Sequence, residues 1–194
     1  MIALIDYDAG NMRSVEKALT YLGERPVITR KREEILKADR IILPGVGSFG
    51  DAMENLERFR LSEVLKEAAK RQIPLLGICL GMQVLFEASE ESPGVKGLWD
   101  LRWTDRPYPE ERGTEDSAHG WNSLSCAPDG TLFEGLPDHP YVYFVHSYYL
   151  KAKDPQIVKA MAEYGVMIHA RWRAAMFSAV SFTRKRVGRQ GFTF

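Results

Sequence analysis

Short apolar runs alternate with amphipathic segments through the first half of the chain. We predict buried strands at residues 2–6, 26–28, 40–43 and 74–78. Apolar side chains recur at helical spacing over residues 12–22, 33–38 and 61–71, and a further helical pattern follows residue 50. Strands alternating with helices predict a parallel sheet wound by helices, an α/β fold of the flavodoxin-like kind. The loops at the carboxyl ends of its strands should meet at one edge.

The second half of the chain follows a different pattern. A strand dense in aromatic residues is predicted at 141–149, with weaker strand patterns at 156–162, 166–172 and 175–182. We expect a single domain over residues 1–194 with an antiparallel, β-rich second half. The stretches at about 99–119 and 167–194 are atypical, and we expect the chain after about residue 166 to pack poorly.

Composition and charge narrow the function classes. Of the 194 residues, 45% are hydrophobic and 27% charged, and the net charge is zero. No global field therefore attracts nucleic acid or an anionic membrane, and no apolar run is long enough to span a bilayer. The chain starts directly with the run at residues 2–5, without a signal peptide, so we expect a cytoplasmic protein. We expect no metal and no other cofactor, because His and Cys show no ligand spacing.

The segment Gly77-Ile78-Cys79-Leu80-Gly81 ends an apolar run and leads into a helix-like stretch. This is the arrangement of a nucleophile elbow, with sulfur where many hydrolases carry a hydroxyl. A tight turn requires small residues on both sides of the nucleophile. The helix N-terminus is expected to lower the pKa of the Cys79 thiol. The alternative is a buried cysteine between incidental glycines. The other cysteine, Cys126, lies in a different context, so a disulfide is not expected.

Two further loops end strands at the predicted edge. The turn after Asp6 leads into the first helix, and residues 44–50 (Pro-Gly-Val-Gly-Ser-Phe-Gly) follow the third strand. This glycine-rich loop matches neither common phosphate-binding motif; it would either hold a phosphate or offer N–H groups to an oxyanion. The basic cluster Arg30–Arg32 is interpreted as a solvated face.

Five segments together carry a family resemblance. They are residues 6–15 (Asp-Tyr-Asp-Ala-Gly-Asn-Met-Arg-Ser-Val), 43–50 (Leu-Pro-Gly-Val-Gly-Ser-Phe-Gly), 77–83 (Gly-Ile-Cys-Leu-Gly-Met-Gln), 120–122 (Gly-Trp-Asn) and 143–148 (Tyr-Phe-Val-His-Ser-Tyr). In this order they resemble the class I, or triad, glutamine amidotransferases. More narrowly, they resemble the glutaminase subunits of imidazole glycerol phosphate synthase, from histidine biosynthesis. The resemblance spans about residues 1–98 and 120–166.

The resemblance implies a catalytic role for Cys79, which would attack the carboxamide of glutamine and form a thioester. It assigns the oxyanion to the N–H groups of Leu80 and of the Val46–Gly47 loop. Substrate-binding positions that it implies are Gln83, Glu91, His146, Ser147 and Tyr148. For His146 the alternative is a histidine with an ordinary structural role.

The resemblance also implies a partner. Ammonia would pass through a channel to the cyclase subunit, a (β/α)8 barrel, in a heterodimer. The matching docking positions are Gly10, Asn11, Trp121 and Tyr143. For Trp121 and Tyr143 the alternative is ordinary core packing. Neither a nucleic acid nor a membrane is an expected partner.

The C-terminal region departs from the family pattern, which places a histidine and a glutamate in Phe-His-Pro-Glu-Lys-Ser. Here Thr183 and Lys185 occupy those positions. A threonine is no base near neutral pH, and a lysine has the wrong charge to orient an imidazolium. We therefore expect the chain as written to have little or no glutaminase activity.

The genetic code suggests an explanation. Residues 178–187 can be encoded by a string that, read two bases later, gives Gly-Gly-Gln-Phe-His-Pro-Glu-Lys-Ser. Residues 114–119 can likewise give Leu-Lys-Ile-Pro-His-Met one base later, directly before Gly120. We hypothesise that about 99–119 is out of frame, and that a second shift follows about residues 166–170.

Three functions remain open. The first is the glutaminase subunit, hydrolysing glutamine to glutamate and ammonia. The second is a non-catalytic, glutaminase-like subunit that only binds the cyclase partner, which the loss of the triad base favours. The third is another cysteine hydrolase on the same fold, such as an amidotransferase-like peptidase; Gln83 and the run His146–Tyr148 argue against it.

Overall fold

The computed structural model describes residues 1–99, 103–107, 118–127, 135–146, 148–152, 155–164, 166–174 and 177–180. The strands of the first half are β1 (Ile2–Ile5), β2 (Pro26–Thr29), β3 (Arg40–Gly45) and β4 (Leu75–Cys79). Its helices are α1 (Met12–Tyr21), α2 (Arg32–Leu36), α3 (Phe49–Arg58), α4 (Leu61–Lys70) and α5 (Leu80–Gln83).

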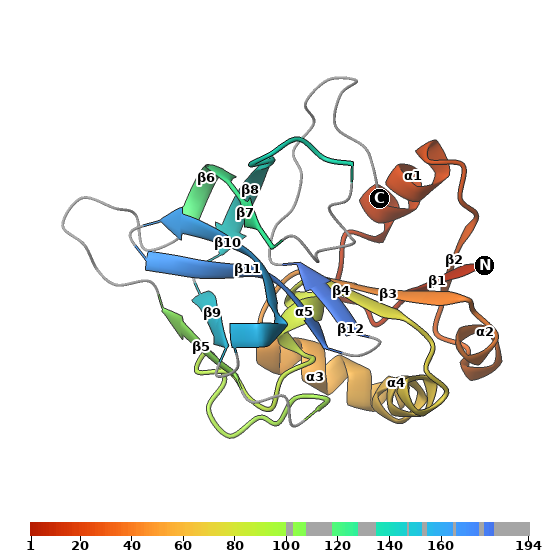
Figure 1. Ribbon diagram of the computed structural model, residues 1–194. Coiled ribbons are helices and arrows are strands. Elements are labelled where there is room, and N and C mark those ends of the chain that lie inside the picture. Colours follow the sequence, from red (N-terminus) through yellow and green to blue (C-terminus); the bar gives the residue numbers. More distant parts are fainter. Residues whose placement is uncertain are drawn as a thin grey trace.

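The second half consists mainly of strands (Figure 1). They are β5 (Trp103–Pro107), β6 (Ala118–Ser123), β7 (Ser125–Cys126), β8 (Tyr141–His146), β9 (Tyr148–Ala152), β10 (Val158–Tyr164), β11 (Val166–Ala174) and β12 (Phe177–Val180). A short 3-10 helix, η2 (Pro155–Ile157), precedes β10.

An eight-stranded sheet forms the centre of the fold, in the order β2-β1-β3-β4-β12-β11-β10-β7. Strand β1 runs parallel to β2 and β3, and β4 runs parallel to β3. The predicted parallel sheet is therefore confirmed. Because these strands are parallel, the chain after Ile5, after Gly45 and at Cys79 leaves the sheet at the same edge.

The alternation of side chains along the strands explains why helices cover both faces of the sheet. In β1, Ala3 and Ile5 pack in the large core with α2, α3 and α4, whereas Ile2 and Leu4 pack with Leu19 of α1. Alternate residues of a strand point to opposite faces. In Figure 1, α1 accordingly lies on one side of the sheet, and α2, α3 and α4 lie on the other.

The two halves of the sheet meet between β4 and β12. Strand β12 runs parallel to β4, with Val180 opposite Ile78, whereas β11, β10 and β7 continue the sheet in antiparallel pairs. The second half is thus β-rich and mostly antiparallel, but it extends the parallel sheet rather than forming a separate layer. The predicted strand at 141–149 corresponds to β8 and the start of β9, with Ser147 between them outside the described residues.

The expectation of poor packing after residue 166 is wrong for residues 166–174 and 177–180. These residues form β11 and β12 of the main sheet. Ile168 and Ala170 alternate along β11 and are buried in a second core with Phe144. Regular alternation of apolar side chains suffices to hold a strand in a sheet. Residues 181–194 lie outside the described residues.

Smaller ladders complete the structure. Strand β5 pairs with β9, and β6 pairs with β8, both antiparallel. The second core joins Val142 and Phe144 of β8 to β10 and β11. Among the helices that the structure describes, none has both the length and the apolar character that crossing a lipid bilayer requires.

Candidate active site at the nucleophile elbow

Cys79 lies at the sharp turn between β4 and α5. Its backbone has φ 57° and ψ −122°, a conformation that non-glycine residues rarely adopt. A Cβ atom added to Gly77 would lie 2.7 Å from the carbonyl oxygen of Gly81. One added to Gly81 would overlap the carbonyl oxygen of Leu43. Both flanking glycines are therefore required by the close approach of the backbone, as expected of a nucleophile elbow.

The glycine-rich loop after β3 lies beside the elbow. Gly45, the last residue of β3, is opposite Cys79 in the sheet register. Beyond it, the side chain of Val46 is 53% exposed, and Gly47 has φ 106°. The left-handed conformation of Gly47 favours glycine at this position. The location of the loop beside a thiol favours the oxyanion interpretation over the phosphate interpretation.

The protonation of Cys79 differs from the sequence-based expectation. Burial raises the pKa of its thiol to about 11, although the backbone N–H of Leu80 opposes this by hydrogen bonding to the sulfur. Helix α5 has only four residues, so its dipole is short. Desolvation of the charged form outweighs the single N–H group. The expected lowering of this pKa is therefore wrong for the isolated chain, and the thiol is protonated at neutral pH.

Two candidate substrate-binding residues lie close to these elements. Gln83 is the last residue of α5, half-buried and one helical turn after Cys79. The carboxylate of Glu91 accepts a hydrogen bond from the backbone N–H of Phe49 at 2.9 Å, at the start of α3. Beside it, the hydroxyl of Ser92 accepts from the N–H of Gly50 at 3.0 Å. The segment containing Glu91 therefore holds the first turn of α3, directly after the glycine-rich loop.

The other candidate residues are described only in part. His146 ends β8 and Tyr148 begins β9, so their backbones are defined, whereas Ser147 lies outside the described residues. Thr183 and Lys185 also lie outside the described residues. They follow β12 by three and five positions, and β12 ends beside β4, at the edge where Cys79 lies.

The docking candidates lie in two places. Asn11 caps α1, where its side-chain oxygen accepts from the N–H of Ser14 at 3.3 Å, and Gly10 precedes it. Trp121 of β6 and Tyr143 of β8 are opposite one another, with ring centroids 5.7 Å apart and planes at 73°. Trp121 is 42% exposed. Ordinary core packing therefore does not describe Trp121, whereas Tyr143 is half-buried.

Comparison with known proteins gives a consistent result. Residues 3–180 match the family described as glutamine amidotransferase class-I. The chain belongs to this family. It is 46% identical over 166 residues to the imidazole glycerol phosphate synthase subunit HisH of Methanocaldococcus jannaschii, covering 85% of this chain and 81% of that protein. It is 48% identical over 168 residues to HisH of Bacillus cereus strain G9842, covering 87% and 79%.

A longer match has lower identity. HisH 1 of Methanococcus maripaludis is 38% identical over 196 residues, covering 98% of this chain and 95% of that protein. Within the class I amidotransferases, the chain thus belongs with the HisH subunits.

Solved structures support the fold alone. A crystal structure of a glutamine amidotransferase aligns with TM-score 0.71 at 19% identity, covering 94% of this chain and 90% of that one. PurLQS from Thermotoga maritima aligns with TM-score 0.70 at 16% identity, covering 94% and 86%. The predicted class I amidotransferase fold is confirmed.

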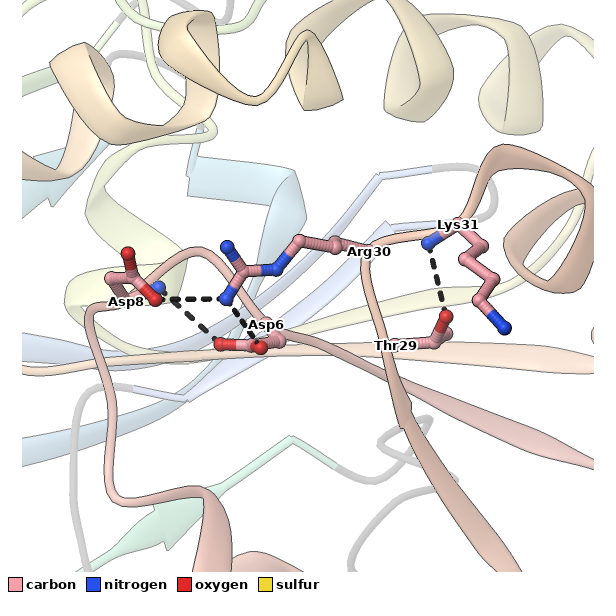
Figure 2. Close-up of polar contacts among 5 residues, drawn as sticks. All are labelled: Asp6, Asp8, Thr29, Arg30 and Lys31. Atoms are coloured by element: carbon pink, nitrogen blue, oxygen red, sulfur yellow. Dashed lines mark hydrogen bonds and ion pairs between the residues drawn. The ribbon is translucent and has the colours of Figure 1, made fainter.

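An arginine near the site was overlooked in the sequence. Figure 2 shows Arg30 donating from Nη2 to Oδ2 of Asp6 at 2.5 Å and to Oδ1 of Asp8 at 2.8 Å. Its guanidinium also stacks on the ring of Phe59, 4.1 Å from the centroid. Arg30 is partly exposed, as expected for a solvated face, but its guanidinium is also held by two carboxylates and an aromatic ring. The sequence contained a sign that Arg30 lies near Asp6. Arg30 follows β2 as Asp6 follows β1, and neighbouring parallel strands end side by side.

The site has the groups for acyl transfer through sulfur. A thiol in an elbow, the N–H of Leu80 and an adjacent glycine-rich loop provide a nucleophile and donors for an oxyanion. Within the described residues, no group of three or more His, Cys, Asp or Glu side chains is placed to hold a metal ion.

Proposed function

We propose that the chain is the glutaminase subunit of an imidazole glycerol phosphate synthase, hydrolysing glutamine to glutamate and ammonia. The observation that carries the proposal is Cys79 in a left-handed turn between two sterically required glycines, beside the loop that begins at Gly45. The HisH relatives support the same assignment from the sequence.

The reaction begins with ionised Cys79. Its sulfur attacks the carboxamide carbon of glutamine, and the carbonyl oxygen takes the negative charge. The N–H groups of Leu80 and of the Val46–Gly47 loop donate to that oxygen. When the C–N bond breaks, the nitrogen takes up a proton and leaves as ammonia. Water then cleaves the thioester, which releases glutamate and restores the thiol.

The remaining candidate residues hold the substrate. Gln83 is half-buried one turn after the nucleophile, which suits contact with the bound glutamine. We assign the amino-acid end of glutamine to Glu91, His146, Ser147 and Tyr148. In this proposal the carboxylate of Glu91 also maintains the start of α3, since it accepts from Phe49.

A base is essential in this site because the pKa of Cys79 is about 11. At neutral pH the thiol must lose its proton to another group before it attacks. Thr183 and Lys185 stand where the family has its histidine and glutamate, and neither removes a proton from a thiol at that pH. We propose that the chain as written releases ammonia at a negligible rate. We attribute the loss to the hypothesised change of reading frame.

The partner is a cyclase subunit with a (β/α)8 barrel, docked over Gly10, Asn11, Trp121 and Tyr143. The exposed aromatic surface supports this assignment, since Trp121 is 42% and the neighbouring Tyr141 67% exposed. Exposed aromatic clusters on soluble domains are typical of protein interfaces. Ammonia would reach the cyclase without release to solvent.

Binding and turnover should be measured separately. The purified chain is mixed with a cyclase subunit from a close relative, and complex formation is measured by calorimetry and ammonia release by a coupled assay. A protein restored to the family frame after residue 166 is the control. We expect both proteins to bind and only the restored one to release ammonia. Release by the chain as written at the restored rate would contradict the loss of activity.

A second function, a non-catalytic subunit that binds the cyclase, is favoured by Thr183 and Lys185. Sequencing the gene across codons 95–194 distinguishes the origins of these residues. An intact frame encoding Thr183 and Lys185, with binding but no turnover, would support the non-catalytic subunit. A frame that restores His and Glu would support the glutaminase. A peptidase assay tests the third function, another cysteine hydrolase on the same fold. Cleavage of a peptide through Cys79 would contradict both the glutaminase and the non-catalytic subunit.

A further inference from the structure

Tyr7 lies next to the nucleophile elbow and has no role in the reaction proposed for glutamine. It is the second residue after β1, and its side chain is 0% exposed. Its hydroxyl lies against Gly45 so closely that a Cβ atom on Gly45 would overlap it. The same added atom would lie 2.6 Å from the backbone nitrogen of Gly81. Since Gly45 is opposite Cys79 in the sheet, the Tyr7 hydroxyl lies among the residues that shape the elbow.

The hydroxyl group is unusual in its burial. Among the described residues, the Tyr7 oxygen has no hydrogen-bond partner. Burying an unpaired hydroxyl costs about 1–3 kcal/mol, a cost that phenylalanine would avoid at the same size. Packing therefore explains the ring but not its oxygen. Both the ring and the hydroxyl are explained if the hydroxyl gains a hydrogen-bond partner only when negative charge develops on a nearby group.

The backbone on both sides of Tyr7 is held by one side chain. Arg30 donates to the carboxylates of Asp6 and Asp8, and Asp8 has φ 59° (Figure 2). These two contacts fix the residues before and after Tyr7. The ring is thus held under Gly45 from both directions, so that little reorganisation is needed when the hydroxyl acts.

We propose that Tyr7 is a positioning residue for the nucleophile, with its hydroxyl donating toward the Cys79 sulfur when the thiol loses its proton. Burial, and secondly the negative charge on Cys79, raise the pKa of Tyr7 well above its usual value. The hydroxyl is therefore protonated at neutral pH and can donate a hydrogen bond. Hydrogen bonds to charged groups are roughly twice as strong as neutral ones.

Titration of the thiol tests this role without any turnover. Thiolate absorbance near 240 nm is followed with pH in protein carrying Cys126→Ser, and the same protein with Cys79→Ser is subtracted. We expect Tyr7→Phe to raise the midpoint for Cys79 by about one pH unit, the effect of losing one hydrogen bond to a charged group. Tyr21→Phe is the matched control, because Tyr21 is 69% exposed on α1. It should leave the midpoint unchanged.

A second measurement separates position from stability. The urea midpoint of Tyr7→Phe at pH 7 should equal or exceed that of the parent, because an unpaired buried hydroxyl is removed. An unchanged thiol midpoint in Tyr7→Phe, at any stability, would overturn the proposal. The alkylation rate of Cys79 at pH 8, resolved from Cys126 by peptide mapping, should fall about tenfold. An unchanged rate would overturn it equally.

The inference rests on the role proposed for Cys79 as nucleophile. Different experiments would contradict the role of Tyr7 and the glutaminase function, however. A shifted thiol midpoint without ammonia release in the frame-restored complex would contradict the glutaminase and leave the Tyr7 contact standing. Ammonia release by that complex, with a thiol midpoint that Tyr7→Phe leaves unshifted, would support the glutaminase and contradict the Tyr7 contact.

Discussion

The backbone of Gly81 lies directly against that of Leu43, so that no side-chain atom fits between them. This contact joins the first turn of α5 to β3 and holds Cys79 at the edge of the sheet. We expect Gly81→Ala to lower the free energy of unfolding by about 3 kcal/mol or more, since the added methyl meets rigid backbone. Urea unfolding measures the change.

The control for Gly81→Ala is Gly50→Ala. Gly50 lies in α3, and an added Cβ there meets only the side chain of Ser92, at 3.1 Å. Alanine also favours a helix by about 1 kcal/mol over glycine. The control should therefore change stability by no more than about 1 kcal/mol. Equal losses in the two variants would contradict the importance of the Gly81–Leu43 contact.

Glu91→Ala should destabilise the fold through the start of α3. The variant removes the acceptor for the N–H of Phe49 and a negative charge at a helix N-terminus. We expect a loss of about 1–2 kcal/mol in the free energy of unfolding. Glu54→Ala, an exposed position within the same helix, should change it by less than about 0.5 kcal/mol. Thermal unfolding of both variants distinguishes a cap from a general effect of charge.

Cys79 should make stability depend on pH at the alkaline end. Its pKa is raised from 9.0 to about 11 on folding, so between these values the folded chain keeps a proton that the unfolded chain has lost. Stability from this group is complete below about pH 9 and falls as the pH rises toward 11, by about 2 kcal/mol. Urea unfolding at pH 8 and 10.5 should show a larger decrease for the parent than for Cys79→Ser. Equal decreases would contradict the raised pKa.

Arg30→Gln should loosen the turn between β1 and α1. The side chains of Arg30, Asp6 and Asp8 are 37%, 31% and 47% exposed, so solvent weakens each ion pair. We expect a loss of about 1 kcal/mol in the free energy of unfolding, reduced by salt. Arg13→Gln is the control, because Arg13 pairs with Glu16 at 83% exposure and should change stability little. If the free energy of unfolding lost in Arg30→Gln does not depend on salt, the loss comes from the stacking of Arg30 on Phe59 and not from its ion pairs.

Much of the first half was predictable because local signals and tertiary structure agree there. Apolar runs, glycines and helical spacing correctly indicated β1 to β4 and the elbow at Cys79. The second half was harder: its local patterns indicated strands but gave no sign that β12 would pair in parallel with β4, far away in the chain. The length of α2 also differed, since it ends at Leu36 rather than at residue 38. Element boundaries depend on contacts that a local pattern does not contain.

The amino-acid sequence by itself determined the α/β pattern and the family, and it predicted Cys79 as the nucleophile. The pattern depends on periodicity, the family on the resemblance of five segments, and the prediction for Cys79 on glycines that must flank a tight turn. Only the tertiary structure decided the ionisation of Cys79, the partners of Arg30 and the place of Tyr7 under Gly45. Each of these depends on burial or on distances between strands far apart in the chain. Desolvation and packing arise only when those strands lie side by side, so no local reading of the sequence contains them.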